Sequence, residues 1–361
     1  MSEQAGQVPS IPEEPTVVRV KANVRMHLKP SDLLQRYALV LVWGIVVLIF
    51  SVIPSTSSTF PTVDNFAGIF GTQAVILITA LALLVPLVAG DYDLSVASNV
   101  MLSAMLIGIF TADHHWNIYV CILLALAVGT LVGAINGAII VLLGIDPFIV
   151  TLGTSTFIVG IVLWISKSNT VTIPVPDGQT TNALSQAVVV DRWPSFFPIP
   201  LMFWYGVALT AILWFVFEFT PLGRRLLFVG RGRSVSRLSG LHVNRIRWGA
   251  LTTSGFLAAG GGVVYAGQTG AADPTSAAQF LLPAFAAAFL GSTSIQPGRF
   301  NPIGLLIAVY FLASGITGFQ LMGAESYVTN LFYGGALVIA VAASQIARRR
   351  EASSAGGPGS T

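Results

Sequence analysis

Long apolar runs separated by short polar segments recur along the whole chain of 361 residues. An α-helix needs about 20 mostly apolar residues to cross the hydrocarbon core of a bilayer. The pattern therefore predicts an all-α integral membrane protein with about ten transmembrane helices, in a range of eight to eleven, because one run is short for a complete span. The predicted spans are 37–53, 72–90, 94–111, 118–143, 147–166, 201–219, 248–266, 280–291 (the short one), 303–322 and 329–347.

Composition agrees with this pattern. Hydrophobic residues make up 54% of the chain and charged residues only 9%, whereas soluble domains carry roughly 25% charged residues. This number of charged residues is too small for the surface of a water-soluble protein of this size. We therefore expect the chain to lie in a lipid bilayer. The formal net charge of +3 is too small to indicate binding to nucleic acid.

The basic residues predict the orientation of the chain, because cytoplasmic loops carry an excess of Lys and Arg. With the N-terminus in the cytoplasm and ten spans, 16 of the 18 Lys and Arg residues lie on the cytoplasmic side. Only Lys167 and Arg192 lie outside. An even number of spans also places the basic C-terminal end in the cytoplasm.

The spans divide the chain into three predicted parts. Residues 1–36 form a cytoplasmic N-terminal segment, with 1–18 disordered and without the apolar start of a cleavable signal peptide. Residues 37–347 form one transmembrane domain, with an external loop at 167–200 that contains a short surface helix and a basic cytoplasmic loop at 220–247. Residues 348–361 form a basic and then disordered tail.

The residue types needed for catalysis or metal binding are sparse. Cys121 is the only cysteine, so the chain forms no internal disulfide, and no set of histidines has the spacing of a metal site. A phosphate-binding loop requires a Gly before its Lys, but Ser166 precedes Lys167, the only lysine followed by Ser or Thr. We therefore expect no enzyme active site and no nucleotide site in this chain.

Two carboxylates, Asp91 and Asp93, interrupt the apolar runs between the second and third spans. An ionised carboxylate at the centre of a membrane helix costs about 3 kcal/mol. One interpretation is a polar substrate path or a fixed break in a helix. The other is a cytoplasmic turn in which Asp93 or Ser95 caps the following helix. The sequence leaves both open.

Small and polar residues in the next two spans offer further candidates. Gly129, Gly133 and Gly137 share one helical face, which predicts close helix packing. Asn136 lies beside them, and a link between helices is favoured over a place in a substrate path. Thr151 is expected to bond back to its own helix. Phe148 would stack on a sugar ring or face lipid, with lipid favoured. The candidate substrate path comprises Asp93, Ser95, Asn136, Phe148 and Thr151.

The cytoplasmic loop TPLGRRLLFVGRGRSVSRLSGLHVNRIRW is longer than orientation alone requires. Its apolar residues alternate with arginines, and several glycines interrupt it. A basic loop of this kind often contacts anionic lipid. Its apolar residues favour instead a short helix that docks into the groove of a partner protein.

Four sequence motifs, which occur in the same order as in a known family, give the chain a family resemblance. They are AGDYDLSVASNVMLSAM, GAINGAIIVLLGIDPFIVTLGTSTFIVGI, the cytoplasmic loop above, and AAFLGSTSIQPGRFNPIGLLIA. Over residues 66–347 the chain resembles the ribose/xylose/galactoside-type permease subunits of bacterial ABC importers. This resemblance implies a type II ABC importer-like fold in the bacterial cytoplasmic membrane, with both termini in the cytoplasm. It also implies import of a sugar-like solute, such as a pentose, hexose or polyol.

The resemblance further implies partners. These are a second permease chain, as a homodimer or heterodimer, an ABC ATPase subunit that binds ATP and Mg, and an extracytoplasmic solute-binding protein. No cofactor is expected in this chain itself. The loop at 220–247 would contact the ATPase, and the residues expected to carry that coupling are Gly223, Arg224, Gly230, Ser239, Gly240 and Leu241.

The chain also departs from the family pattern. Asp93 matches the family's carboxylate, whereas Asp91 is an additional one. An alternative function follows from these residues: a secondary active transporter that uses Asp91 or Asp93 as a proton or cation site. A membrane-embedded enzyme is a third class, which no spacing of nucleophile, base or metal ligand supports.

Overall fold

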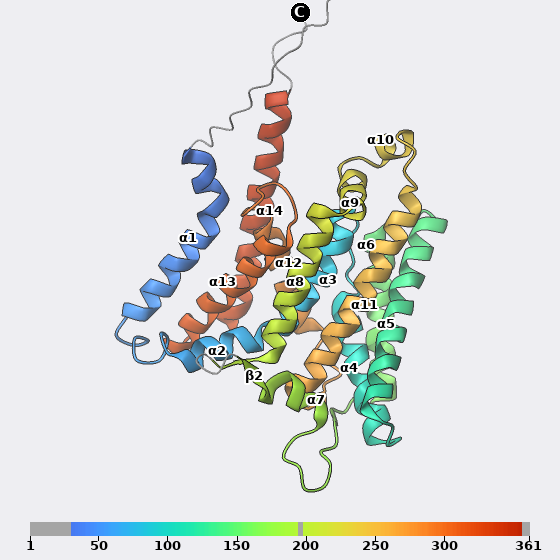
Figure 1. Cartoon of the computed structure of the whole chain (residues 1–361), viewed down its shortest axis with the longest axis vertical. Coiled ribbons are helices and arrows are strands. Elements are labelled where there is room, and N and C mark those ends of the chain that lie inside the picture. Colours follow the sequence, from blue (N-terminus) through green and yellow to red (C-terminus); the bar gives the residue numbers. More distant parts are fainter. Residues whose placement is uncertain (1–29, 194–197, 356–361) are drawn as a thin grey trace, which may run out of the picture.

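The computed structural model describes residues 30–193 and 198–355, with side chains for 36–193 and 198–342. Long helices run side by side in one bundle (Figure 1). Each predicted span contains a helix, so the chain is mostly helical, consistent with an all-α membrane protein. The helices at these spans are α1 (Pro30–Val52), α3 (Ala74–Val88), α4 (Val96–Ala112), α5 (Ile118–Leu142), α6 (Pro147–Ile165), α8 (Leu201–Phe219), α11 (Val243–Thr269), α12 (Ala278–Gly291), α13 (Pro302–Leu321) and α14 (Tyr327–Ala355).

Shorter elements connect these helices. The basic loop at 220–247 contains two helices, α9 (Pro221–Arg231) and α10 (Arg233–Leu238), where its sequence favours a short helix. The loop at 167–200 contains the short helix α7 (Ala183–Ser185), which continues into a π-helical turn. The remaining described elements are α2 (Val63–Thr72) and two antiparallel pairs of two-residue strands, β1 (Val171–Thr172) with β4 (Ala271–Ala272) and β2 (Arg192–Trp193) with β3 (Ile199–Pro200).

Five helical segments of the described chain are long and apolar enough to cross a membrane, and four further apolar helices are shorter. The five are Val63–Val88, Ile118–Leu142, Pro147–Ile165, Leu201–Phe219 and Pro302–Leu321. Helix α12 is short, as its sequence predicts, with 14 residues. At 1.5 Å per residue it is about 21 Å long, less than the roughly 30 Å of hydrocarbon in a bilayer.

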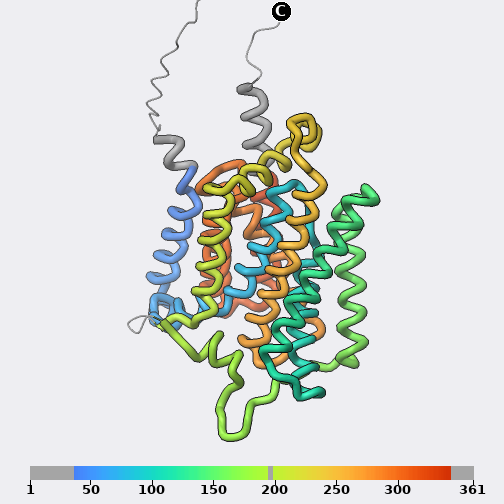
Figure 2. Tube along the Cα trace, turned by 45° about the vertical axis from the view of Figure 1, so that its right-hand side comes forward, coloured from blue at the N-terminus to red at the C-terminus, as the bar shows by residue number. Residues whose placement is uncertain are grey.

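The two ends of the bundle differ. Helix α1 starts and helix α14 finishes at the end that carries α9 and α10 (Figure 1). The long loop between α6 and α8 lies at the opposite end (Figures 1 and 2). The basic loop and both terminal helices thus share one end, as the distribution of Lys and Arg requires.

Three helix boundaries differ from the ends of the predicted segments. Helix α1 begins at Pro30 rather than near Tyr37, because proline fits the first turn of a helix and helices continue past their apolar part. Helix α14 continues to Ala355, so 351–355 are not part of a disordered tail; the first glycines follow at 356 and 357. The run at 72–90 divides at Gln73 into α2 and α3. The predicted disorder at 1–18 and 356–361 lies outside the described residues.

Helix α11 lies at the centre of one half of the bundle, packed against α3, α4 and α5. The predicted glycine face of α5 makes this approach close, which confirms the packing interpretation. A Cβ atom on Gly133 would overlap the carbonyl oxygen of Leu251, and one on Gly129 would collide with Ala259. Asn99 of α4 also donates to the carbonyl oxygens of Gly129 and Gly255, both at 3.1 Å.

This contact predicts that Gly255→Ala destabilises the protein. A Cβ atom at 255 would collide with the backbone of Gly129 and Gly133. Overpacking of this kind costs about 1–3 kcal/mol, more than the roughly 1 kcal/mol that Ala gains over Gly in a helix. Thermal unfolding in detergent should therefore show a lower Tm.

The matched control is Gly260→Ala in the same helix, because a Cβ atom there would meet no atom within 4 Å. Its Tm should be unchanged or slightly higher. Equal Tm values for the two variants would show that α5 and α11 can separate at little cost.

Candidate functional site

The helical run is broken at residues 89–95, between α3 and α4. Pro86 lies in the last turn of α3, and Gly90 has a φ of 80°, in the left-handed region that favours glycine. The carboxylate and hydroxyl side chains of the break are buried: Asp91, Asp93 and Ser95 are 0%, 1% and 2% exposed. Two carboxylates are therefore buried side by side, and their hydrogen-bond partners decide what they can do.

Asp93 is held by three neutral donors. Its Oδ1 accepts from the backbone N–H and the hydroxyl of Ser95, at 3.0 and 2.6 Å. Its Oδ2 accepts from the hydroxyl of Ser254 on α11, at 2.8 Å. Ser95 therefore does not cap α4 with its side chain, because that hydroxyl is used by Asp93. The carboxylate ties the start of α4 to α11.

A chain of hydrogen bonds continues from Ser95 into two more helices. Asn136 of α5 donates to the Ser95 hydroxyl at 2.9 Å and accepts from the hydroxyl of Thr154 on α6 at 2.6 Å. Thr151 donates back to Pro147 O at 2.8 Å, as expected, and accepts from the N–H of Leu94 at 3.1 Å. The break is thus attached to α5, α6 and α11.

The structure brings together four of the five residues predicted for a substrate path: Asp93, Ser95, Asn136 and Thr151. None is more than 2% exposed, and their side-chain polar atoms are hydrogen-bonded inside the protein, to one another or to Leu94, Thr154 and Ser254. In this conformation they do not face an open space. Their place in a substrate path stays a prediction.

Phe148, the fifth predicted residue, lies apart from this cluster and is 49% exposed. It lines a groove of about 730 Å³ between the α3–α4 break, α6, α12 and α14. Tyr92 and Leu94 from the break contribute to the same groove. The buried polar cluster therefore lies directly behind one wall of a mainly apolar and aromatic groove.

Sequence reasoning missed several residues of this groove, among them Phe285 and Phe289 of α12. The two phenylalanine rings stack, with centroids 6.4 Å apart and planes 18° apart. Their spacing of four in an alanine-rich helix was a usable signal. What could not be foreseen was that α12 would lie opposite Phe148.

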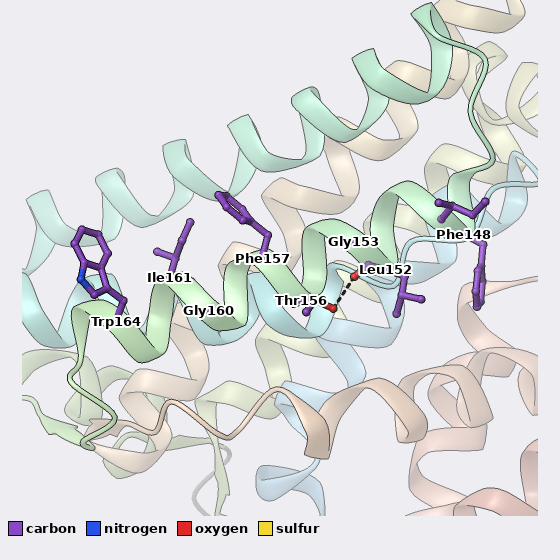
Figure 3. Close-up of a pocket in the computed structure, with 9 residues that line it drawn as sticks. Phe148, Leu152, Gly153, Thr156, Phe157, Gly160, Ile161 and Trp164 are labelled. Atoms are coloured by element: carbon purple, nitrogen blue, oxygen red, sulfur yellow. Dashed lines mark hydrogen bonds between the residues drawn. The ribbon is translucent and has the colours of Figure 1, made fainter.

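A second, shallower groove of about 870 Å³ follows the outer face of α6 (Figure 3). It extends from Phe148 past Phe157 to Trp164, and Gly153 and Gly160 lie along it without close neighbours. Trp164 is 80% exposed. This long apolar face of α6 is available to lipid or to another membrane protein.

Asp91 is bound by two arginines from distant parts of the sequence. Arg247 of α11 donates to both carboxylate oxygens, from Nε to Oδ2 and from Nη2 to Oδ1, each at 2.8 Å. Arg233 of α10 donates from Nη2 to Oδ1 at 2.6 Å and to Gly90 O at 2.8 Å. The sequence offered a signal in the arginine-rich loop but no means of choosing these two.

The predicted coupling residues take three kinds of position. Gly223 and Gly230 are contact points with the bundle, because a Cβ atom at 223 would overlap the end of α8 and one at 230 would overlap Val88 O. Arg224 and Ser239 are exposed and Leu241 is half-buried. Gly240 has a φ of 78° and makes the turn after α10.

The outer face of α10 combines exposed apolar side chains with basic ones. Val235 is 58% exposed and Leu238 is 89% exposed, and Arg237 between them is also exposed. Thr220 caps α9 through a bond from Gly223 N at 3.3 Å. A short helix with an exposed leucine at the tip of a basic loop has the features of a docking element.

Metal binding finds no support in the described part of the chain, which contains no cluster of three or more His, Cys, Asp or Glu side chains that could hold an ion.

Comparison with known proteins identifies relatives. Residues 65–341 match the family model described as "Branched-chain amino acid transport system / permease component". The ribose import permease protein of Haemophilus influenzae is 28% identical over 296 residues, which covers 82% of this chain and 89% of the relative.

Two further relatives extend this comparison. The D-allose transport system permease protein of Escherichia coli is 28% identical over 91% of this chain and 97% of its own length. The autoinducer 2 import system permease protein of Photorhabdus luminescens is 30% identical over 73% of this chain and 78% of its own length. No solved structure matches the chain at a significant level.

The geometry at Asp91 predicts the effect of Asp91→Asn on stability. Arg247 is only 8% exposed in its side chain, so neutralising Asp91 leaves a buried guanidinium without its counter-charge. Breaking a buried pair in this way costs about 3–5 kcal/mol. The variant should show a large drop in Tm and in the yield of folded protein.

The control is Asp113→Asn, which also removes one carboxylate but from an exposed position at the end of α4. Its Tm should stay within experimental error of the unmodified chain. A similar, small effect of both substitutions would contradict a structural role for the buried ion pair.

Proposed function

The chain belongs to the branched-chain amino acid transport system permease component family, and from this membership we propose that it is the membrane-spanning subunit of an ABC importer for a sugar or sugar-like solute. The observation that carries the proposal is the match over residues 65–341, together with relatives named for the import of ribose, D-allose and autoinducer 2. The family consists of transport components rather than enzymes, and its members are multi-pass membrane proteins.

The chemistry of the groove supports a neutral polar solute. Aromatic side chains line it from three directions, with Tyr92 in the break, Phe148 in α6 and Phe285 in α12. Such faces pack against the C–H faces of a sugar ring. The buried carboxylates are paired or hydrogen-bonded, so the groove offers no free charge that would select an ion. A pentose, hexose or polyol fits this chemistry.

The proposed transport cycle needs two permease chains. A solute-binding protein would deliver the solute at the end that carries the 167–200 loop, and the cytoplasm would lie at the end that carries α9 and α10. In this arrangement both termini are cytoplasmic, the fold is of the type II importer kind, and the membrane is the bacterial cytoplasmic membrane. The groove beside Phe148 would form part of the path between the two chains.

We propose that ATP and Mg are bound by a separate ATPase subunit. The exposed face of α10, with Val235 and Leu238, would insert into a groove of that subunit. Gly223 and Gly230 would fix α9 against the bundle, so that movement of the ATPase is passed to the helices. Arg224, Ser239, Gly240 and Leu241 would shape the ends of this contact.

The alternative of a secondary transporter gains no support from the site. Asp91 is paired with Arg233 and Arg247, and Asp93 accepts from three neutral donors. A proton or cation site requires a carboxylate that exchanges its partner with solvent or an ion. Asp93 is buried with both of its oxygens hydrogen-bonded, and both oxygens of Asp91 are held by buried Arg247.

The proposed function is tested by reconstitution. The chain is purified in mild detergent with the ATPase and binding protein encoded beside its gene, and placed in vesicles. We expect a stoichiometric ATPase to co-purify and ATP-dependent uptake of one labelled sugar from a panel of pentoses, hexoses and polyols. A branched-chain amino acid in the panel tests the substrate in the family's name. Uptake driven by a proton gradient without ATP would contradict the proposal.

A substitution in α10 tests the ATPase contact. Leu238→Asp places a charge on the most exposed apolar residue of α10, which in a docked complex would be buried without a partner at a cost of several kcal/mol. We expect ATPase co-purification to fall at least tenfold, about 1.4 kcal/mol or more in binding free energy, with unchanged Tm of the chain.

The matched control is Val175→Asp, an exposed apolar residue of the loop at the opposite end of the bundle. It should retain the ATPase. If Leu238→Asp binds the ATPase as well as the control does, α10 is not the docking element.

A further inference from the structure

Asp91 is the point where three segments of the chain meet. It belongs to the α3–α4 break, while Arg233 comes from α10 and Arg247 from α11. Arg233 lies 142 residues after Asp91 in the sequence, and Arg247 lies 156 residues after it. The backbones of α9 and α3 also approach closely here, because a Cβ atom on Gly230 of α9 would overlap Val88 O at the end of α3.

The two ion pairs differ in burial and in geometry. Arg247 is 8% exposed and contacts both carboxylate oxygens, whereas Arg233 is 40% exposed and contacts one. A bidentate buried pair is costly to break, because each partner would be left as an unpaired buried charge. A partly exposed pair is weak, because water can replace either partner.

The Arg247 contact is therefore sufficient to neutralise Asp91 and to satisfy both of its oxygens. If Arg233 moves away, no buried charge is left unpaired, and its guanidinium is rehydrated. If Arg247 moved away, the carboxylate would keep only one partner, which solvent reaches. The geometry makes one contact fixed and the other reversible.

We propose that Asp91 is a positioning residue whose contact with Arg233 is released and remade as α9 and α10 move in the transport cycle, while its contact with Arg247 persists. The inference rests on the proposed function, in which α9 and α10 follow the ATPase. It assigns a role to the carboxylate that the family pattern does not contain.

The contact has a direct route to the groove. Arg233 also donates to Gly90 O, so a displacement of α10 acts on the backbone at Gly90 and Asp91. The next residue, Tyr92, lines the groove together with Leu94. The following carboxylate, Asp93, is fixed to Ser95 and Ser254. If the backbone at Gly90 and Asp91 moves while Asp93 stays in place, Tyr92 between them shifts in the groove wall.

The test measures coupling rather than activity alone. Arg233→Ala is compared with the unmodified chain in vesicles that contain the complete transporter with its ATPase and binding protein. Readouts are solute imported per ATP hydrolysed and stimulation of ATPase activity by loaded binding protein. We expect both ratios to fall about two- to fivefold, the size expected for loss of one partly exposed ion pair, with unchanged ATPase co-purification. Arg233→Lys, which retains the charge, should recover part of the loss.

Arg245→Ala is the matched control, because it removes an exposed arginine near the same end without contact to Asp91. Its coupling ratios should equal those of the unmodified chain. Asp91→Asn is not suitable as the main variant, since it also removes the partner of buried Arg247.

Two outcomes overturn the inference. One is a set of coupling ratios for Arg233→Ala equal to those of Arg245→Ala. The other is a parallel loss of uptake and ATPase activity in proportion to assembled complex, which indicates a purely structural contact. Failure of the proposed function is distinct, because the unmodified chain would then show no ATP-driven uptake at all.

Discussion

Polar groups buried at residues 89–95 have no water to bind, so each must find its partner inside the protein. That constraint accounts for the arrangement around the break. Asp93 accepts from Ser95 and Ser254, and Asp91 accepts from Arg233 and Arg247. The partners come from α10 and α11, so the break fixes the position of these segments relative to α3 and α4.

These bonds form only because the helices approach closely. Gly129, Gly133 and Gly255 leave no side chain between α5 and α11, and Asn99 bridges their backbones. With α11 at this distance, Ser254 reaches Asp93 in the break. The polar cluster thus depends on the glycine contact. A larger residue in that contact would move α11 away from α5 and would weaken the bond between Ser254 and Asp93.

The same arrangement links the two regions to which the proposed function assigns the solute and the ATPase. The groove beside Phe148 has Tyr92 and Leu94 in its wall, and the basic segment with α9 and α10 abuts the break at Gly90 and Val88. A solute at one region and an ATPase at the other would act on the same seven residues. The aromatic groove wall suits a neutral sugar, and the exposed Leu238 suits a protein partner.

The sequence by itself determined which segments form long apolar helices, where the basic loop interrupts them, and that Gly129, Gly133 and Gly137 form a packing face. These features depend on local hydrophobicity, charge and spacing, which are readable along the chain. The tertiary structure alone decided that Asp91 pairs with Arg233 and Arg247, that Asp93, Ser95, Asn136 and Thr151 form a buried cluster, and that Phe285 lies across a groove from Phe148. Such contacts join residues far apart in sequence, and the packing of whole helices, rather than any local pattern, selects each partner.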